Sequence, residues 1–196
     1  MLAIFKREFK SYFQNVIGWL FVAALLAVYG LYFYVYNLKN GYPYISYDLK
    51  GIGFIMMIAV PILTMRSLSD EKKTKTDQLM LTSPVSVGRI VAGKYLAMAA
   101  VYTIDIALFA LSPLVLSIYG KVALSEAYVA LFGYWLYGLS CIAVGLFISS
   151  ISESVIISAI LTFAALFLSY MMQSITGLIS SSGNLLTKVL NCFDLY

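Results

Sequence analysis

Histidine is absent from this chain of 196 residues. Its absence excludes histidine-ligated metal sites, serine–histidine and cysteine–histidine nucleophile pairs, and the usual proton relay at neutral pH. Charged residues make up only 11% of the chain, whereas a soluble domain carries about 25%. Cysteine occurs only as Cys141 and Cys192. The two are far apart and Cys141 lies in an apolar run, so we expect free thiols rather than a disulfide framework.

Apolar residues dominate what is present: 62% of the chain is hydrophobic and the mean hydropathy is +0.90. Apolar runs of about 20 residues cross a bilayer as helices, because lipid cannot satisfy an open backbone. The sequence therefore predicts an all-α polytopic helical bundle, a single membrane domain over residues 1–196. The expected transmembrane helices are five, at about residues 17–36, 51–68, 87–118, 127–149 and 155–176.

Residues 2–15 precede the first apolar run and have two unlike faces. The apolar face carries Leu2, Phe5, Phe9, Tyr12 and Phe13, whereas Lys6, Arg7, Lys10 and Gln14 fall away from it. This pattern predicts an amphipathic helix in the membrane interface. The alternative is a basic flank that only fixes the topology.

Lysine and arginine placement predicts the orientation. With the N-terminus in the cytoplasm, nine of the 13 basic residues fall on cytoplasmic segments, and only Lys39, Lys50, Lys121 and Lys188 lie outside. Because basic residues concentrate on the cytoplasmic side, we expect this orientation, with residues 177–196 extracytoplasmic. The same sorting accounts for the net charge of +4 without a nucleic-acid partner.

Residues 66–94 form a polar island between two apolar spans and carry nine of the 22 charged residues. Thr76 can cap a short helix from Asp77 to Thr82, which Ser83-Pro84 would end. Ser86 can then cap the third span. An ordinary solvated loop, whose leucines pack under the membrane interface, is an equally good interpretation of the same residues.

The island ends in a near match to a phosphate-binding loop, at residues 88–95. We reject that assignment, because Tyr95 replaces the hydroxyl that would hold Mg²⁺ and no strand precedes the segment. We expect no cofactor on this chain and no catalytic residue. Any ATP hydrolysis must come from another chain.

Asp105 lies near the middle of the third span, between two isoleucines. A carboxylate at that depth is costly, so it usually faces a cavity or a partner. One interpretation is a polar point in a substrate or ion path. The interpretation we favour is a buried acid that bonds Ser112, a tyrosine or a neighbouring helix.

Small residues recur along the fourth span: Gly138, Cys141, Gly145 and Ser149. Their spacing permits close contact with another helix. We expect this contact inside the bundle rather than between copies.

Several segments in fixed order resemble the permease subunits of ABC-2 type transporters, and the closest subgroup in pattern includes the gliding-motility-associated permeases. The resemblance rests on residues 5–13, on Pro61–Arg66 through residues 70–86, on Gly93-Lys94-Tyr95 and on residues 143–150. It covers nearly the whole chain and implies a bacterial cytoplasmic-membrane protein that pairs with a second permease and with two cytoplasmic ATPase subunits.

The resemblance also implies functional segments. Residues 2–15 would be the interfacial elbow helix and residues 66–86 the cytoplasmic coupling segment. The coupling helix that contacts the ATPase would comprise Thr76, Asp77, Gln78, Leu79, Met80, Leu81 and Thr82. The family has six spans where five are visible here, so we expect the native product to be longer or the sixth helix to come from elsewhere.

Three other functions compete with a permease. A secondary transporter would use Asp105 for ion coupling, but no inverted half and no second buried charge accompany it in the sequence. An intramembrane hydrolase would need a lysine or second carboxylate at the depth of Asp105, and none is apparent. A non-transporting membrane scaffold would not stimulate a partner ATPase.

Overall fold

The computed structural model describes residues 2–42, 44–73, 86–119 and 122–179 of the chain. The described residues form helices and no strands. The helices are α1 (Leu2–Gln14), α2 (Val16–Tyr32), η1 (Phe33–Lys39), α3 (Ser46–Thr64), α4 (Ser69–Lys73), α6 (Val87–Phe109), α7 (Ser112–Tyr119), α8 (Leu124–Ile151) and α9 (Val155–Ile179). The all-α class is confirmed.

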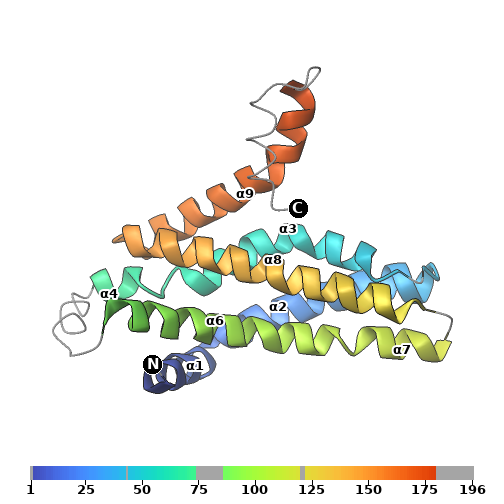
Figure 1. Ribbon diagram of the computed structural model, residues 1–196, viewed down its shortest axis with the longest axis horizontal. Helices are drawn as coiled ribbons and strands as arrows, with labels where there is room; N and C mark the ends of the chain where they lie inside the picture. Colours follow the sequence, from blue (N-terminus) through green and yellow to red (C-terminus); the bar gives the residue numbers. More distant parts are fainter. Residues whose placement is uncertain (1, 43, 74–85, 120–121, 180–196) are drawn as a thin grey trace.

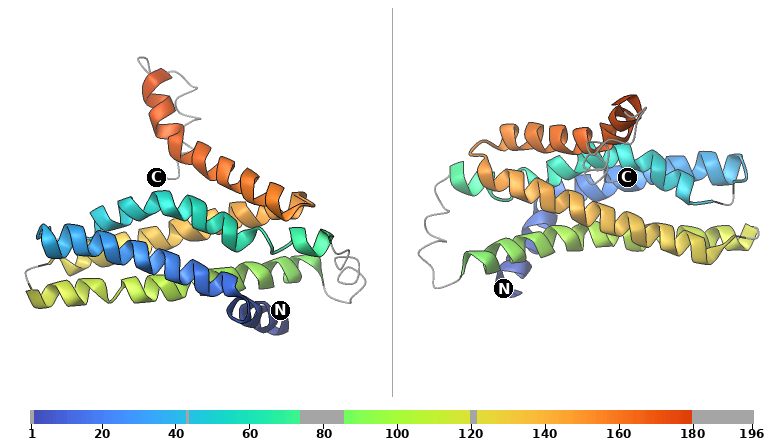
Figure 2. Two further views of the ribbon diagram at one scale, coloured as in Figure 1. Left: turned by 180° about the vertical axis from the view of Figure 1, so that it is seen from behind. Right: turned by 45° about the horizontal axis from the view of Figure 1, so that its top comes forward.

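Five helical segments of the described chain are long and apolar enough to cross a membrane: Val16–Lys39, Ser46–Thr64, Val87–Ile118, Leu124–Ile151 and Val155–Met172. This agrees with the five spans expected from the sequence. Four of them lie lengthwise beside one another, with α1 across one end, whereas the C-terminal part of α9 bends away from the bundle (Figures 1 and 2).

Two span boundaries differ from expectation. The expected spans at about residues 17–36 and 51–68 left residues 37–50 as a loop between them, but the first span continues to Lys39 as a π-helix and the second already begins at Ser46. Two buried polar residues of these segments bond each other: the Asn37 side-chain amide donates to the Asp48 carboxylate. One further oxygen of each side chain has no hydrogen-bond partner among the described residues. Paired in this way, the two side chains can lie within helices.

The third span is interrupted, which the sequence analysis missed. It consists of α6 and α7, separated by a turn at Ala110 and Leu111. Pro113 has no N–H to donate to the carbonyl of Phe109. The Ser112 hydroxyl donates to that carbonyl instead, at 2.7 Å, so the freed backbone group remains bonded.

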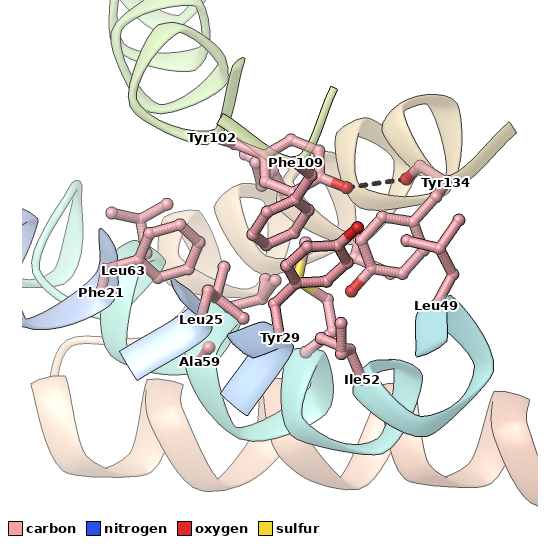
Figure 3. Close-up of a cluster of buried hydrophobic side chains, with 14 of the residues drawn as sticks. Phe21, Leu25, Tyr29, Leu49, Ile52, Ala59, Leu63, Tyr102, Phe109 and Tyr134 are labelled. Atoms are coloured by element: carbon pink, nitrogen blue, oxygen red, sulfur yellow. Dashed lines mark hydrogen bonds between the residues drawn. The ribbon is translucent and has the colours of Figure 1, made fainter. Parts of the chain in front are cut away.

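The core lies where α2, α3, α6 and α8 meet (Figure 3). Tyr29 stacks on Phe109 with ring centroids 4.1 Å apart. The Tyr102 hydroxyl crosses from α6 and donates to the Tyr134 carbonyl of α8 at 2.7 Å. A Cβ added to Gly138 would meet the Tyr102 ring at 2.3 Å, so a small residue there lets this ring lie against α8.

Helix α1 packs on α6 and α2 with its aromatic side. Phe5, Phe9 and Phe13 form a continuous stack that ends on Trp19 of α2. Lys6, Arg7 and Lys10 are exposed on the other side. The amphipathic helix is therefore present, while its placement in a membrane interface stays a prediction.

Candidate functional site

The expected coupling helix, Thr76–Thr82, lies outside the described residues. The structure does describe the segments on both sides of it. Helix α4 ends at Lys73 and α6 begins at Val87, both at the end of the bundle that carries α1 (Figure 1). We call this end the junction and define it by α1, residues 65–73, the first two turns of α6, and the α8–α9 turn.

Ser149 links the start of α4, where the chain enters the junction, with the end of α8. It is fully buried, and its hydroxyl oxygen accepts hydrogen bonds from the backbone N–H groups of Leu68 and Ser69, both at 3.2 Å. The Ser69 hydroxyl in turn donates to the Ser149 carbonyl at 3.1 Å. These bonds satisfy backbone groups that helix ends leave open. The start of α4 is consequently fixed to α8.

Lys72 makes a second connection between the same elements. Its ammonium donates to the carbonyl of Ser150, in the last turn of α8. A cation is favourable there, because carbonyls at a helix C-terminus carry partial negative charge. The side chain thus holds α4 close to the point where α8 turns into α9.

Lys94 joins three elements within the junction. Its side chain is only 2% exposed; its ammonium donates to the Ser67 carbonyl at 2.8 Å and lies 3.5 Å from a carboxylate oxygen of Glu8 on α1. A buried charge of this kind is tolerated only when it is paired and hydrogen-bonded. Residues 88–95, which resemble a phosphate-binding loop in sequence, lie on α6 rather than in a loop.

Ser86 takes the expected position at the start of α6, but not the expected bond. It is the N-cap residue, with an extended backbone, yet its side chain makes no capping hydrogen bond. Its carbonyl accepts from Arg89 and Ile90 as the first turn requires. The boundary was predicted correctly and the capping interaction was wrong.

Asp105, the expected intramembrane polar site, is completely buried, and neither carboxylate oxygen has a hydrogen-bond partner among the described residues. The expected bond to Ser112 or a tyrosine is therefore wrong. Ser112 bonds Phe109 and Tyr29, and Tyr102 donates to a carbonyl of α8. These neighbouring donors are engaged elsewhere.

The predicted small-residue stripe lies at the contact between α8 and its neighbours in the bundle. Gly138, Cys141, Gly145 and Ser149 are all buried. A Cβ on Gly145 would meet the Thr64 hydroxyl of α3 at 2.5 Å. The stripe thus brings α3 and α8 close enough for the Ser149 bonds to form.

No group of three or more metal-binding side chains occurs within the described part of the chain. Comparison with known families gives a clear result. A family model described as "ABC-2 family transporter protein" matches residues 8–196. The chain belongs to this family.

Membership makes the protein a membrane-spanning permease component of an ABC transporter. The narrower resemblance to gliding-motility permeases is not established by the match. No curated protein and no solved structure matches the chain.

Within this ABC-2 chain, sequence reasoning missed the hydrogen bonds that form the junction. Lys94 was noted in a near match to a phosphate-binding loop and Ser149 as a small residue, and both lie in segments that carry the family resemblance, but no hydrogen bond was predicted for either. Their bonding partners are 27 and about 80 positions away in the chain. One signal was available: a lysine within an apolar helix needs a partner.

Proposed function

We propose that this permease is driven by a separate cytoplasmic ATPase, which binds the segment between α4 and α6, and that it forms the translocation path with a second permease. Thr76–Thr82 would be the coupling helix in that segment, by its position in the family pattern. The ATPase supplies nucleotide hydrolysis, and this chain needs no cofactor for its part.

One observation supports the coupling role above the others: both ends of the segment leave from anchored structure. At the entry, Ser69 and Lys72 are bonded to the end of α8. Close to the exit, Lys94 of α6 binds the Ser67 carbonyl and faces Glu8 of α1. A force applied to the segment would therefore reach α1, α3, α6 and α8 together.

The charge distribution supports the proposed orientation in a bacterial cytoplasmic membrane. Basic side chains at the junction end are Lys6, Arg7, Lys10, Arg66, Lys72, Arg89 and Lys94, whereas the opposite end of the described chain has Lys39 and Lys50. By the positive-inside rule this favours a cytoplasmic junction, where an ATPase can reach it.

The test replaces an apolar side chain of the coupling helix with a charge. Leu79→Asp should leave membrane insertion intact and weaken ATPase binding and transport together. A buried leucine contributes about 1.5–3 kcal/mol, so binding should fall at least tenfold. The measurements are ATPase pull-down and substrate turnover on the same membranes.

Leu124→Asp is the matched control, because Leu124 is 38% exposed at the opposite end of the bundle; it should retain both activities. If Leu79→Asp and Leu81→Asp each keep wild-type binding and turnover, this helix is not the coupling element.

A further inference from the structure

A polar pocket of about 520 Å³ lies between α1, the turn that joins α3 to α4, and α6. Its size falls within the range of about 300–1,000 Å³ that is typical of small-molecule sites. Its lining is almost entirely polar, with Ser11 and Gln14 of α1 beside several charged side chains. The functions proposed above assign no ligand to this pocket.

Five charged side chains line the pocket, and the cations exceed the carboxylates by one. The cations are Arg7, Arg66 and Lys94, and the carboxylates are Glu8 and Asp70. A carboxylate oxygen of Glu8 lies 2.9 Å from the Arg7 guanidinium and 3.5 Å from the Lys94 ammonium, so one carboxylate faces two cations. The excess of one positive charge favours a ligand that carries one negative charge.

Arg66 supplies a cation that a ligand can reach. The residue is exposed, and no ion pair or hydrogen bond within the described part of the chain involves its guanidinium. Ser67, next to it in the lining, is buried, and its hydroxyl has no hydrogen-bond partner among the described residues. A guanidinium can donate to two phosphate oxygens at once. The two neighbours therefore offer hydrogen-bond donors to an anion.

The pocket lies at the level where two spans end. Asn15 and Ile17, on either side of the first residue of the first span, line it, and Arg66 follows the last residue of the second span by two positions. Phospholipid headgroups occupy this level of a bilayer. A phosphodiester carries one negative charge, whereas a phosphomonoester carries about 1.5 to 2. The charge of the lining therefore matches a phospholipid diester better than a soluble phosphomonoester.

We propose that this pocket binds the phosphodiester headgroup of one membrane phospholipid. The phosphate lies against Arg66 and Arg7, while the acyl chains stay outside the polar lining. The bound headgroup connects α1 with the turn between α3 and α4. The proposal holds for either orientation of the chain in the membrane and does not depend on ATPase binding.

The test measures which lipids the purified full-length chain retains in detergent. The protein is equilibrated with equal amounts of phosphatidylglycerol and a diacylglycerol with the same acyl chains, and bound lipid is counted by native mass spectrometry. The wild type should prefer phosphatidylglycerol, because only that lipid carries a phosphodiester. Each basic residue near an anionic headgroup contributes about fivefold, so Arg66→Gln should reduce the retention of phosphatidylglycerol by about fivefold.

Arg89→Gln is the matched control. Arg89 is an exposed arginine in the first turn of α6, at the same end of the bundle, but it does not line the pocket. This variant removes the same charge and should keep the wild-type retention. Ser11→Phe fills the pocket from α1 without changing the charge, so it should also reduce retention, while thermal unfolding shows that the protein is folded.

Three results would overturn the proposal. Equal losses in Arg66→Gln and Arg89→Gln would show that surface charge alone retains the lipid. Glycerophosphoglycerol, the same headgroup without acyl chains, should compete only weakly, and competition at equal concentration would assign the pocket to a soluble phosphate compound. If Arg66→Gln kept its lipid but weakened ATPase pull-down, the pocket would receive an acidic group of the ATPase. The retention assay contains no ATPase, so its result is independent of the test of the coupling helix.

Discussion

Lys94 places a positive charge where solvent hardly reaches, between the Ser67 carbonyl and the Glu8 carboxylate. A buried ion pair adds little net stability, because desolvation offsets the attraction. Its role is therefore to hold the surrounding elements in place. The elements it joins are α1, the turn between α3 and α4, and the start of α6. We infer that Lys94 fixes these elements to one another at the junction.

Removing this side chain should loosen the junction. Lys94→Ala leaves the Ser67 carbonyl without this donor and leaves Glu8 with Arg7 alone, and it should destabilise the chain by about 1.5–3 kcal/mol. Thermal unfolding in detergent measures the loss. Lys50→Ala, at an exposed lysine, should change stability by less than about 0.5 kcal/mol. Equal effects of the two substitutions would mean that Lys94 has no anchoring role.

Asp105 gives the opposite case, a buried polar group with no hydrogen-bond partner within the described structure. Desolvating such a group costs free energy without return. Asp105→Asn and Asp105→Leu should therefore leave assembly and ATP-driven transport largely intact, and Asp105→Leu should unfold at the same or a higher temperature. A folded Asp105→Asn variant that binds its ATPase but does not transport would instead assign Asp105 to the transport path.

At the scale of helices, the close approach of α3 and α8 at Gly145 depends on the absence of a Cβ at that position. A Cβ at Gly145 would lie 2.5 Å from the Thr64 hydroxyl, well inside contact distance. The same helix contains Gly133, where an added Cβ meets nothing within 4 Å. Substituting each of the two glycines with alanine therefore separates the effect of packing from the effect of helix propensity.

Gly145→Ala should destabilise the chain by about 1–3 kcal/mol through overpacking. Gly133→Ala should instead be neutral or stabilising by up to about 1 kcal/mol, because alanine is the better helix former. Thermal unfolding of both variants distinguishes the two effects. Adding Thr64→Ala to Gly145→Ala should recover much of the loss, and no recovery would show that the contact with α3 is not the cause.

The interruption between α6 and α7 shows that hydropathy alone does not determine where a helix ends. The apolar pattern of residues 87–118 continues through the break. The proline at 113 removes one backbone donor, and the Ser112 hydroxyl replaces it. The result is a span in two helices whose joint lies against Tyr29 of α2.

For the whole molecule, the orientation in the membrane determines which end an ATPase can meet. Single cysteines at Asn40 and Lys73, in a variant without Cys141 and Cys192, report on the two ends. We expect a membrane-impermeant thiol reagent to label position 40 in intact cells and position 73 only after the cells are opened. Labelling of position 73 from outside would reverse the topology and remove the proposed site for a cytoplasmic ATPase.

The sequence by itself determined the fold class and the number of spans. Long apolar runs satisfy their backbone in lipid as helices, so hydropathy predicts a helix at about residues 17–36 and at each of the four later spans, although the first span in the structure continues to Lys39. The small residues of α8 likewise identified a packing face, because close approach of two helices needs them. The family, too, could be recognised from residues in their order along the chain.

Only the tertiary structure decided which polar groups meet. Asn37 and Asp48 fell in the expected connection between two spans, whereas in the structure they bond each other within helices. The hydrogen-bond partner that we favoured for Asp105 is not found among the described residues. Ser149 and Lys94 became junction residues through contacts with Ser69 and Ser67. Such pairs join distant parts of the chain and depend on directional bonds of about 3 Å. Hydropathy, which sums over neighbours in sequence, carries no information about them.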